Sequence, residues 1–562
     1  MNRKNYIWAL GILFASLCAA LTACVDINDV DGTTPAVPTV NITIDAKKLR
    51  DGNEIGENAG VYEFPPDSAA NVSLNNLDNN QVVFVHLNLS GGRIEARPVS
   101  SWKTSADSSS NRTLLQPGQD AAQAYQPEVT RMEYMPARNF TPPEGIAALP
   151  AQRRSLTART ALTENDYTVD DSKKTFWVQT SKWYEIEATL RYKSEFCFVW
   201  VADENYDSAG NGEFDDNKIT SSQAFTLGEK FNTIYEKETA ILGYEPGGGP
   251  DGDGGIDGLK PVQIFVYDID ADYKKTQTGG VLGYFWAKDL YTQTFWNSNN
   301  NGYKSNEAEI FYLDCHILDK FPSYQYSTLI HEFQHMINFN QKYKLADKSS
   351  ATWYDEMMSM LAEDLIDEFI DIPLDNGGHP VMGRIPLFLS EYSKSGVNEW
   401  VSDRIISYST AYAFGAFLVR NFGGPELLKE MMNNGEVDEK SVVNAVNTLT
   451  GGKWTFNELL VKYPEAFVFN LQNDKHYTFN KTVSANINGI DYTYKAFDIT
   501  TITRSTRASG KGQYFYPSSD EFSVRPNAFL AVSNSQWESI SGNMTLNLQQ
   551  PLKDTRVFLI LK

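Results

Sequence analysis

The chain has 562 residues, with 71 Asp and Glu against 49 Lys and Arg, and its formal net charge is −22. Such an acidic chain, in which no basic cluster stands out, excludes nucleic acid as an expected partner. Hydrophobic residues make up 41% of the chain and aromatic residues 13%, which excludes a disordered protein and allows large buried cores. The length and the mixture of strand-like and helix-like segments predict a multidomain protein of the α+β class.

The start of the chain predicts export. Arg3 and Lys4 precede an apolar stretch that is too short for a transmembrane helix, and this order is typical of a signal peptide, here residues 1–23. Residues 24–42 are polar and contain prolines. This composition predicts a tether that holds the folded part of the protein away from a membrane.

A lipid anchor is expected at the end of the signal peptide. The letters Leu-Thr-Ala-Cys, which end at Cys24, resemble a bacterial lipobox. Cleavage before Cys24 leaves a cysteine that carries several acyl chains, and these anchor a protein stably. Val25 follows, which favours the outer membrane or surface of a bacterial cell envelope. The alternative is ordinary secretion after cleavage behind Ala23.

Strand-like segments dominate the first half of the remaining chain. Residues 43–175 predict an N-terminal, mostly β domain with mobile polar loops. After it, residues 221–242 show the apolar spacing of one long amphipathic helix. Further strands are expected at 196–202, 262–267, 281–285 and 308–313.

Two acidic, glycine-rich loops and two cysteines allow further sites. The loops 203–217 and 250–258 alternate Asp with Gly, and oxygen ligands so placed can bind Ca²⁺, although ordinary turn chemistry is the favoured interpretation. Cys18 leaves with the signal peptide and Cys24 is expected to be lipidated, so Cys197 and Cys315 are the cysteines that remain. They form either one disulfide or two buried free thiols.

The central motif is H-E-x-x-H at residues 331–335. Residues four apart lie on one face of a helix, so His331 and His335 can present two nitrogens to one metal ion. Glu332 lies beside the first ligand and can act as general base on a water at that metal. The alternative without a metal is a pair of buried, hydrogen-bonded histidines on an ordinary helix.

A third metal ligand is expected from the next helix, residues 352–364. Asn338 and Gln341 stand where a metzincin has Gly and His, so that class is excluded. Glu356 is the predicted ligand, because it lies in an apolar helix close behind the motif and completes a His₂Glu zinc site. Glu363 or Asp364, about two turns further on, is expected to orient a histidine through its other ring nitrogen.

The last part of the chain predicts more helices and then strands. Helices are expected at 425–434, 439–449 and 456–470, and these complete a helical half of the catalytic domain. Residues 476–562 return to alternation with many aromatic residues, which predicts a separate C-terminal β-sandwich.

The letters H-E-F-Q-H-M-I-N-F, followed by W-Y-D-E-M-M-S-M-L-A-E-D, resemble the hyicolysin family of secreted bacterial zinc metallopeptidases. The resemblance covers about residues 175–475. It implies peptidase activity, one catalytic zinc ion, an extracytoplasmic location, and membership of the wider gluzincin group, in which a Glu completes the H-E-x-x-H site. The sequence departs from thermolysin-like enzymes of that group at Met360, where they carry an Asp.

The same resemblance assigns further roles. It implies a zincin-like catalytic domain at 176–475, with a mixed sheet above a helical half. By analogy with aminopeptidases of the group, Tyr412, three residues before a Gly, is expected to donate to the oxyanion of the transition state, and Tyr408 is the second candidate for this role. The strand at 308–313 is expected to be the sheet edge on which a peptide lies. The chain lacks the G-x-M-E-N motif of aminopeptidases, which favours an endopeptidase.

The sequence therefore predicts a membrane-anchored zinc endopeptidase that acts on peptides or proteins. His331, His335 and Glu356 hold the metal and Glu332 moves the proton. A rival hypothesis from a different class is a surface lipoprotein that binds host or matrix ligands through its β domains and carries an inert metallopeptidase-like core.

Overall fold

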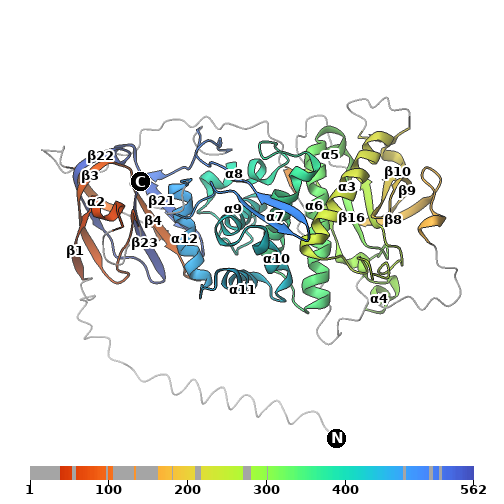
Figure 1. Cartoon of the computed structure of the whole chain (residues 1–562), viewed down its shortest axis with the longest axis horizontal. Helices are drawn as coiled ribbons and strands as arrows, with labels where there is room; N and C mark the ends of the chain where they lie inside the picture. The colour runs from red at the N-terminus through yellow and green to blue at the C-terminus, as the bar shows by residue number, and fades with distance from the viewer. Residues whose placement is uncertain are drawn as a thin grey trace, which may run out of the picture.

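The computed structural model arranges the chain as three blocks in a row (Figure 1): a β-sandwich, a central block of helices, and a block built on a six-stranded sheet. The N-terminal signal segment and Cys24 lie outside the described residues and stay predictions. The structure describes residues 38–52, 59–96, 99–104, 132–133, 163–179, 182–208, 217–269, 280–299, 302–472, 476–505, 510–517 and 522–562.

The six-stranded sheet is mixed. Its central strands β10, β13 and β16 run parallel to one another, and antiparallel neighbours flank them on both sides. The three central strands are buried along their whole length, which explains their continuous apolar sequences. In sheet order the strands are β15 (Gly283–Phe285), β16 (Ile310–Asp314), β13 (Val262–Tyr267), β10 (Cys197–Ala202), β9 (Trp183–Lys193) and β8 (Lys173–Gln179).

The edge of this sheet is not the strand that the sequence indicated. We expected residues 308–313 to form the edge, but β16 lies between β13 and β15. The reason is the short strand β15, which pairs antiparallel with β16 and covers its outer side. Gly283 lets β15 approach closely, because a Cβ there would lie 2.7 Å from the Tyr312 carbonyl oxygen and 2.9 Å from Thr328 on the next helix.

Two helices cover one face of the sheet. The long helix α3 (Ser221–Leu242) has the bounds that its apolar spacing predicts, and Thr220 begins it with a capping box. Helix α6 (Pro322–Asn338) packs beside it, with the Phe333 ring 5.1 Å from Phe231 and 5.4 Å from Tyr235. In Figure 1 both helices stand between the sheet and the central helical block.

The central block consists of helices that pack on α6. Helix α7 contacts α6 on one side and α9 on the other, so it is buried along almost its whole length. The helices are α5 (Cys315–Lys320), α7 (Thr352–Ile366), α8 (Pro380–Glu391), α9 (Arg404–Phe422), α10 (Pro425–Asn433), α11 (Asp438–Thr450) and α12 (Phe456–Phe469), with a π-helical turn η5 (Phe339–Leu345) after α6 and a 3-10 turn η6 (Asp367–Ile370) after α7.

One sandwich contains strands from both ends of the chain, where the sequence analysis expected two separate β modules. In each sheet, strands before residue 105 pair with strands after residue 515. Strand pairing across such a separation leaves no local pattern, so strand-rich segments at the two ends look independent. The sheets are β1 (Thr39–Asp45), β3 (Ala69–Asn80), β22 (Ile540–Leu548) and β6 (Val99–Thr104), and β19 (Tyr516–Pro517), β21 (Phe529–Ser533), β4 (Val82–Asn88), β23 (Thr555–Leu561) and β2 (Val61–Glu63).

The domain boundaries also differ from the expected ones. Strand β1 begins inside the predicted tether, and β8 continues across the boundary expected at residue 175. The hairpin of β17 (Val483–Ile487) and β18 (Ile490–Tyr494) packs on helices of the central block, because the Tyr494 hydroxyl donates to the Leu361 carbonyl at 3.0 Å.

Several short elements complete the described structure. Among the described residues, none of the helices has both the length and the apolar character needed to cross a bilayer. The short elements are α2 (Ala46–Arg50), β5 (Ile94–Ala96), β7 (Met132–Glu133), η1 (Glu164–Asp166), η2 (Asp203–Asn205), β11 (Tyr206–Asp207), β12 (Ile219–Thr220), β14 (Gly280–Val281), η4 (Ala287–Leu290), α4 (Gln293–Ser298), β20 (Phe522–Val524) and η7 (Ser535–Trp537).

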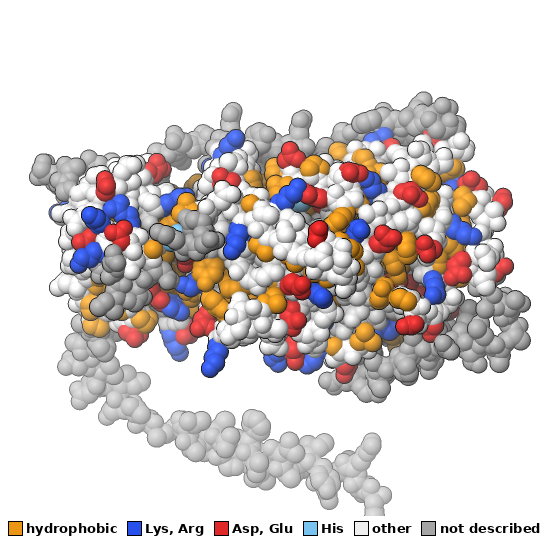
Figure 2. All heavy atoms as spheres, viewed as in Figure 1, with side chains coloured by type: hydrophobic (Ala, Val, Ile, Leu, Met, Phe, Trp, Pro, Cys, Tyr) orange, Lys and Arg blue, Asp and Glu red, His pale blue; other side chains and the backbone are white. Residues whose placement is uncertain are grey.

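The charged side chains on the surface are of both signs. On the face that Figure 2 shows, acidic and basic side chains are interspersed over the described residues, so charge is spread rather than gathered on that face.

Cys197 and Cys315 are both buried free thiols, which is the second of the two alternatives that the sequence allowed. The Cys315 thiol donates to the Asn217 carbonyl at 3.3 Å.

Candidate metal centre

The site lies where helices α6 and α7 face each other. Their side-chain contacts run in opposite directions along the two helices, so the helices are antiparallel. Four pairs show this order: Ser327 with Asp367, His331 with Glu363, Gln334 with Ser359, and Asn338 with Asp355.

Three predicted ligands meet at the middle of this contact. The donor atoms of His331, His335 and Glu356 all lie within 4.8 Å of one another, and the three side chains are buried. His331 Nε2 is 3.0 Å from Glu356 Oε2, and His335 Nε2 is 3.5 Å from the same oxygen. Among the described residues, this is the one group of three or more such side chains that can hold a metal ion.

Each histidine has an acidic partner at its other ring nitrogen. His331 Nδ1 lies 2.6 Å from Glu363 Oε1, as expected for one of the two acids considered. His335 Nδ1 lies 3.0 Å from Asp355 Oδ1, a partner that sequence reasoning missed. A carboxylate at Nδ1 fixes the tautomer and ring orientation, which leaves Nε2 available as a ligand.

The charges of the cluster are strongly coupled. Burial alone lowers the pKa of His331, but its hydrogen bonds to Glu356 and Glu363 outweigh burial and raise that pKa. Burial likewise opposes the raised pKa of His335, which the charges of Asp355 and Glu356 push well above its ordinary value. Burial raises the pKa of Glu356, but the two histidines more than offset it and bring that pKa to about 2. The cluster therefore attracts positive charge, as a cation site does.

Glu332 differs from the acids around it. Its side chain is fully buried, and neither carboxylate oxygen has a hydrogen-bond partner among the described residues. Burial raises its pKa to about 7, although the two histidines oppose the shift. A buried carboxylate without a partner is costly to stability, so it is expected where a ligand or water completes its environment.

Asp364 takes part in a different network, and the expectation that it orients a histidine ligand is not met. It accepts two hydrogen bonds from Arg420, at 2.9 and 3.1 Å, and a third from the Tyr412 hydroxyl at 2.9 Å. Asp364 and Glu363 are adjacent on a helix, where neighbouring side chains point about 100° apart. Only Glu363 therefore faces α6.

Tyr412 is consequently bound to Asp364, and the structure does not bring it to the metal ligands. Burial raises its pKa, and the strongest charge acting on it is that of Asp364. The nearby Gly415 has a packing reason: a Cβ there would lie 2.8 Å from Met357 on α7. The Gly of this Tyr and Gly spacing therefore has a packing role at the close contact of α9 with α7.

Tyr408, one turn earlier on α9, lies within electrostatic reach of the cluster. Burial raises its pKa well above the ordinary value, and the negative charges of Glu356 and Glu332 add to this effect. The Arg384 guanidinium lies 4.9 Å from the centre of the Tyr408 ring. Tyrosines one turn apart lie on the same helix face, so their spacing alone cannot tell which one approaches a ligand.

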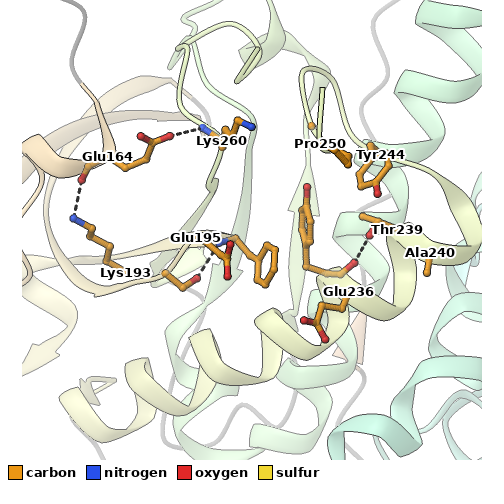
Figure 3. Close-up of a pocket in the computed structure, with 14 residues that line it drawn as sticks. Glu164, Lys193, Glu195, Glu236, Thr239, Ala240, Tyr244, Pro250 and Lys260 are labelled. Atoms are coloured by element: carbon orange, nitrogen blue, oxygen red, sulfur yellow. Dashed lines mark hydrogen bonds between the residues drawn. The ribbon is translucent and has the colours of Figure 1, made fainter. Parts of the chain in front are cut away.

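A separate cavity of about 700 Å³ lies beside the C-terminal half of α3, between the turn that joins β9 to β10 and the loop that follows α3 (Figure 3). Phe196 and Tyr235 stack in it with their ring centres 4.8 Å apart, and Lys193 and Lys260 lie at its rim. None of the metal-site residues lines it.

Glu245, behind this cavity, gives a pH-dependent prediction. It accepts a hydrogen bond from Tyr235 at 3.0 Å, and burial raises its pKa to about 7. Because the folded-state pKa exceeds the unfolded one, its stabilising protonation is complete below about pH 4.5 and is lost as pH rises through 7. As the pH rises from 4.5 to 8, we expect the free energy of unfolding of Glu245→Gln to increase by up to about 3 kcal/mol relative to that of the native chain. Denaturant unfolding at several pH values measures this.

Glu236→Gln, at an exposed position of α3, is the matched control, with the same charge change but no burial. A stability difference between Glu245→Gln and the native chain that stays constant with pH would contradict the prediction.

The acidic loop 250–258 follows ordinary turn chemistry. Asp253 accepts a hydrogen bond from the Gly255 amide, and Asp257 accepts one from the Leu259 amide. Within the described residues, no three metal-binding side chains converge there, so no calcium site is assigned. Part of the other predicted loop, residues 209–216, lies outside the described residues.

Comparison with known proteins agrees with the site. Residues 204–480 match the family described as Peptidase M30. Over 330 residues the chain is 28% identical to Neutral metalloprotease ShpI of Staphylococcus hyicus, in an alignment that covers 56% of this chain and 66% of that protein. The chain thus spans just under two thirds of that relative's length. Both matches support a metallopeptidase.

Proposed function

We propose that the protein is a zinc endopeptidase that hydrolyses peptide bonds at the contact of α6 and α7. The observation that carries the proposal is the buried cluster of His331, His335 and Glu356 next to the unpartnered carboxylate of Glu332. Two neutral imidazoles and one carboxylate are a donor set that suits zinc and leaves a fourth position for substrate or water. The family match and the metalloprotease relative support this function.

The residues of the chain have distinct tasks in this mechanism. His331, His335 and Glu356 would hold the zinc ion, which when bound would supply Lewis-acid polarisation of the scissile carbonyl and a lowered pKa of water. Glu363 and Asp355 hold the two imidazoles in the orientation that presents Nε2. Glu332 accepts a proton from the attacking water and then passes it to the leaving amine. Its burial, which raises its pKa to about 7, suits a group that must both accept and release a proton.

The substrate is proposed to be a peptide in extended conformation. Strand β15 is the edge of the six-stranded sheet and packs against α6, which carries the site. An edge strand offers backbone groups with which an extended peptide can pair. Attachment to a bacterial outer membrane through Cys24 belongs to the same proposal and rests on the sequence alone.

Zinc analysis together with peptide cleavage tests the proposal. We expect residues 25–562, purified without chelator, to contain one zinc ion per chain. We also expect them to cleave internal bonds of a quenched peptide library until chelator is added. A chain without zinc, or one that binds zinc but cleaves no member of a broad library or folded protein panel, would count against it. The rival binding lipoprotein predicts the latter result.

Tyr408→Phe is expected to lower kcat about 100-fold, because its hydroxyl is proposed to donate to the oxyanion of the transition state. KM should change little, since the interaction forms only in that state. The matched variant is Tyr412→Phe. It also removes a tyrosine hydroxyl, one helical turn from Tyr408, but this hydroxyl donates to Asp364. It should keep kcat within about 3-fold and lose about 1 kcal/mol of stability. The reverse order of effects would restore Tyr412 to the catalytic role.

A further inference from the structure

The buried side chains of Glu363, Ser327 and Asp367 form a series of close polar contacts that begins at His331. Glu363 Oε1 lies 2.6 Å from His331 Nδ1, and its other oxygen, Oε2, lies 3.0 Å from Ser327 Oγ. Ser327 Oγ is also 3.0 Å from Asp367 Oδ2. All four side chains have at most 1% of their surface exposed, so bulk water does not bridge them.

If Glu363 and Asp367 are both ionised, there are too few hydrogen atoms to make a hydrogen bond at each of these contacts. A serine hydroxyl has one hydrogen and therefore donates to one oxygen at a time. Ser327 lies at hydrogen-bond distance from two carboxyl groups, Glu363 and Asp367. One contact is therefore a repulsion between lone pairs unless one of the two acids carries a proton and donates it to Ser327 Oγ.

The surroundings identify the acid that carries the proton. Both oxygens of Glu363 are hydrogen-bonded, one to His331 and one to Ser327, as expected for a carboxylate. Asp367 Oδ1, in contrast, has no partner among the described residues. Burial, followed by the charge of Glu363, raises the pKa of Asp367 well above its ordinary value.

No basic group on the neighbouring elements neutralises Asp367 within the described structure. Lys230 of α3 donates to the Ile370 carbonyl and to Asp371, while Lys495 pairs with Glu368. The other titratable groups nearby are Glu363 and Asp364 of α7, Glu368 of η6, His331 of α6, Lys237 and Glu238 of α3, and His379 before α8.

We propose that Asp367 is a neutral carboxylic acid that donates a hydrogen bond to Ser327, and that Ser327 in turn donates to Glu363. Asp367 and Ser327 are then positioning residues, because they hold the side chain of Glu363 directed at His331. Their effect on the metal rests on the proposed function, whereas the protonation of Asp367 does not.

The direct test is infrared spectroscopy of protein with ¹³C-labelled aspartate carboxyl groups. We expect a protonated-carboxyl band at pH 8 that is present in the native chain and absent from Asp367→Asn, in both the metal-free and the zinc-loaded protein. Absence of that difference band would overturn the proposal. Because the metal-free protein is used, the result is independent of whether the chain proves to be a zinc peptidase.

Substitutions provide a second test. An Asn amide at position 367 can replace the donated hydrogen bond, so Asp367→Asn should keep the zinc Kd within about 3-fold. Asp367→Leu and Ser327→Ala break the chain of hydrogen bonds and should raise the zinc Kd about 10- to 100-fold. Equal loss of zinc affinity in Asp367→Asn and Asp367→Leu would show that the carboxylate charge, not a donated hydrogen bond, is needed.

Thermal unfolding gives a third readout that needs no metal. An acid whose folded-state pKa is raised stabilises the fold at low pH, and this contribution is lost as pH rises. Asp367→Asn does not titrate, so its melting temperature should rise relative to that of the native chain between pH 5 and 8. A constant difference over this range would mean that Asp367 is already ionised in the folded protein.

Discussion

Replacing Glu332 by Gln is expected to lower kcat at least about 1,000-fold while the zinc content stays at one ion per chain. An amide has nearly the same size and still fills the buried position, but it cannot accept the proton of the attacking water. Zinc should remain, because Glu332 is not among the three converging ligands. Steady-state cleavage of the best library peptide, together with zinc analysis of the same sample, measures both effects.

Glu332→Asp is the informative companion. It keeps a carboxylate but withdraws it by one methylene group, so we expect activity between that of the native enzyme and Glu332→Gln. If Glu332→Gln retained more than a tenth of the native kcat, another group would have to be the general base. If it lost zinc as well, Glu332 would belong to the ligand set.

Replacing the buried Arg420 by an uncharged residue is expected to lower the free energy of unfolding strongly. Arg420 is fully buried and bonds to Asp364 through two nitrogens, and its guanidinium lies 4.6 Å from the centre of the Phe497 ring. Arg420→Met leaves Asp364 as a buried charge that keeps the Tyr412 hydroxyl as a donor and His379 Nε2 at 3.7 Å, but has lost its guanidinium partner. Breaking such a pair from one side costs about 3–5 kcal/mol, which denaturant unfolding can measure.

The double variant Asp364→Asn with Arg420→Met separates charge from packing. It removes both charges, so it should recover a large part of the stability that Arg420→Met loses. The exposed pair of Lys173 and Glu187 is the control, with side chains 56% and 61% exposed. Lys173→Met should cost less than about 1 kcal/mol. A similarly small loss for Arg420→Met would show that the buried pair contributes little.

The helices that carry the site were predictable from local sequence. Helix α3 has the predicted bounds, α7 begins at the predicted residue 352 and ends at 366 rather than 364, and α6 contains the whole motif 331–335. Their signals are local: apolar spacing in each helix, a capping box at the start of α3, and no Pro or Gly within α7 or within α6 after its first residue. The ligand motif was readable for the same reason, because the i and i+4 positions of one helix fix their own relative geometry.

The groups around the ligands depended on how two helices pair, which local patterns do not specify. The partner of His335 is Asp355, whereas Glu363 serves His331. The antiparallel order of α6 and α7 determines both pairings, since the later histidine must meet the earlier acid. With that order known, Asp355 could have been found from the sequence.

Non-local pairing was the main limit for the fold. Strand-like segments were recognised at both ends of the chain, but the hydrogen bonds that join them connect residues as distant as Asn79 and Ser541. Alternation of polar and apolar residues identifies a strand and its buried face, and carries no information about which strand lies beside it.

The shared sandwich also has a consequence for the order in which the polypeptide can fold. Strands β3 and β4 leave the ribosome early, but their partners β22 and β23 are among the last residues synthesised. The intervening helices and sheet can fold first, while β4 lacks both of its partners and β3 has only β1 beside it until synthesis is almost complete. Completion of the sandwich is therefore expected to be the late, slow step of folding, and truncation before β22 should leave both early strands prone to aggregation.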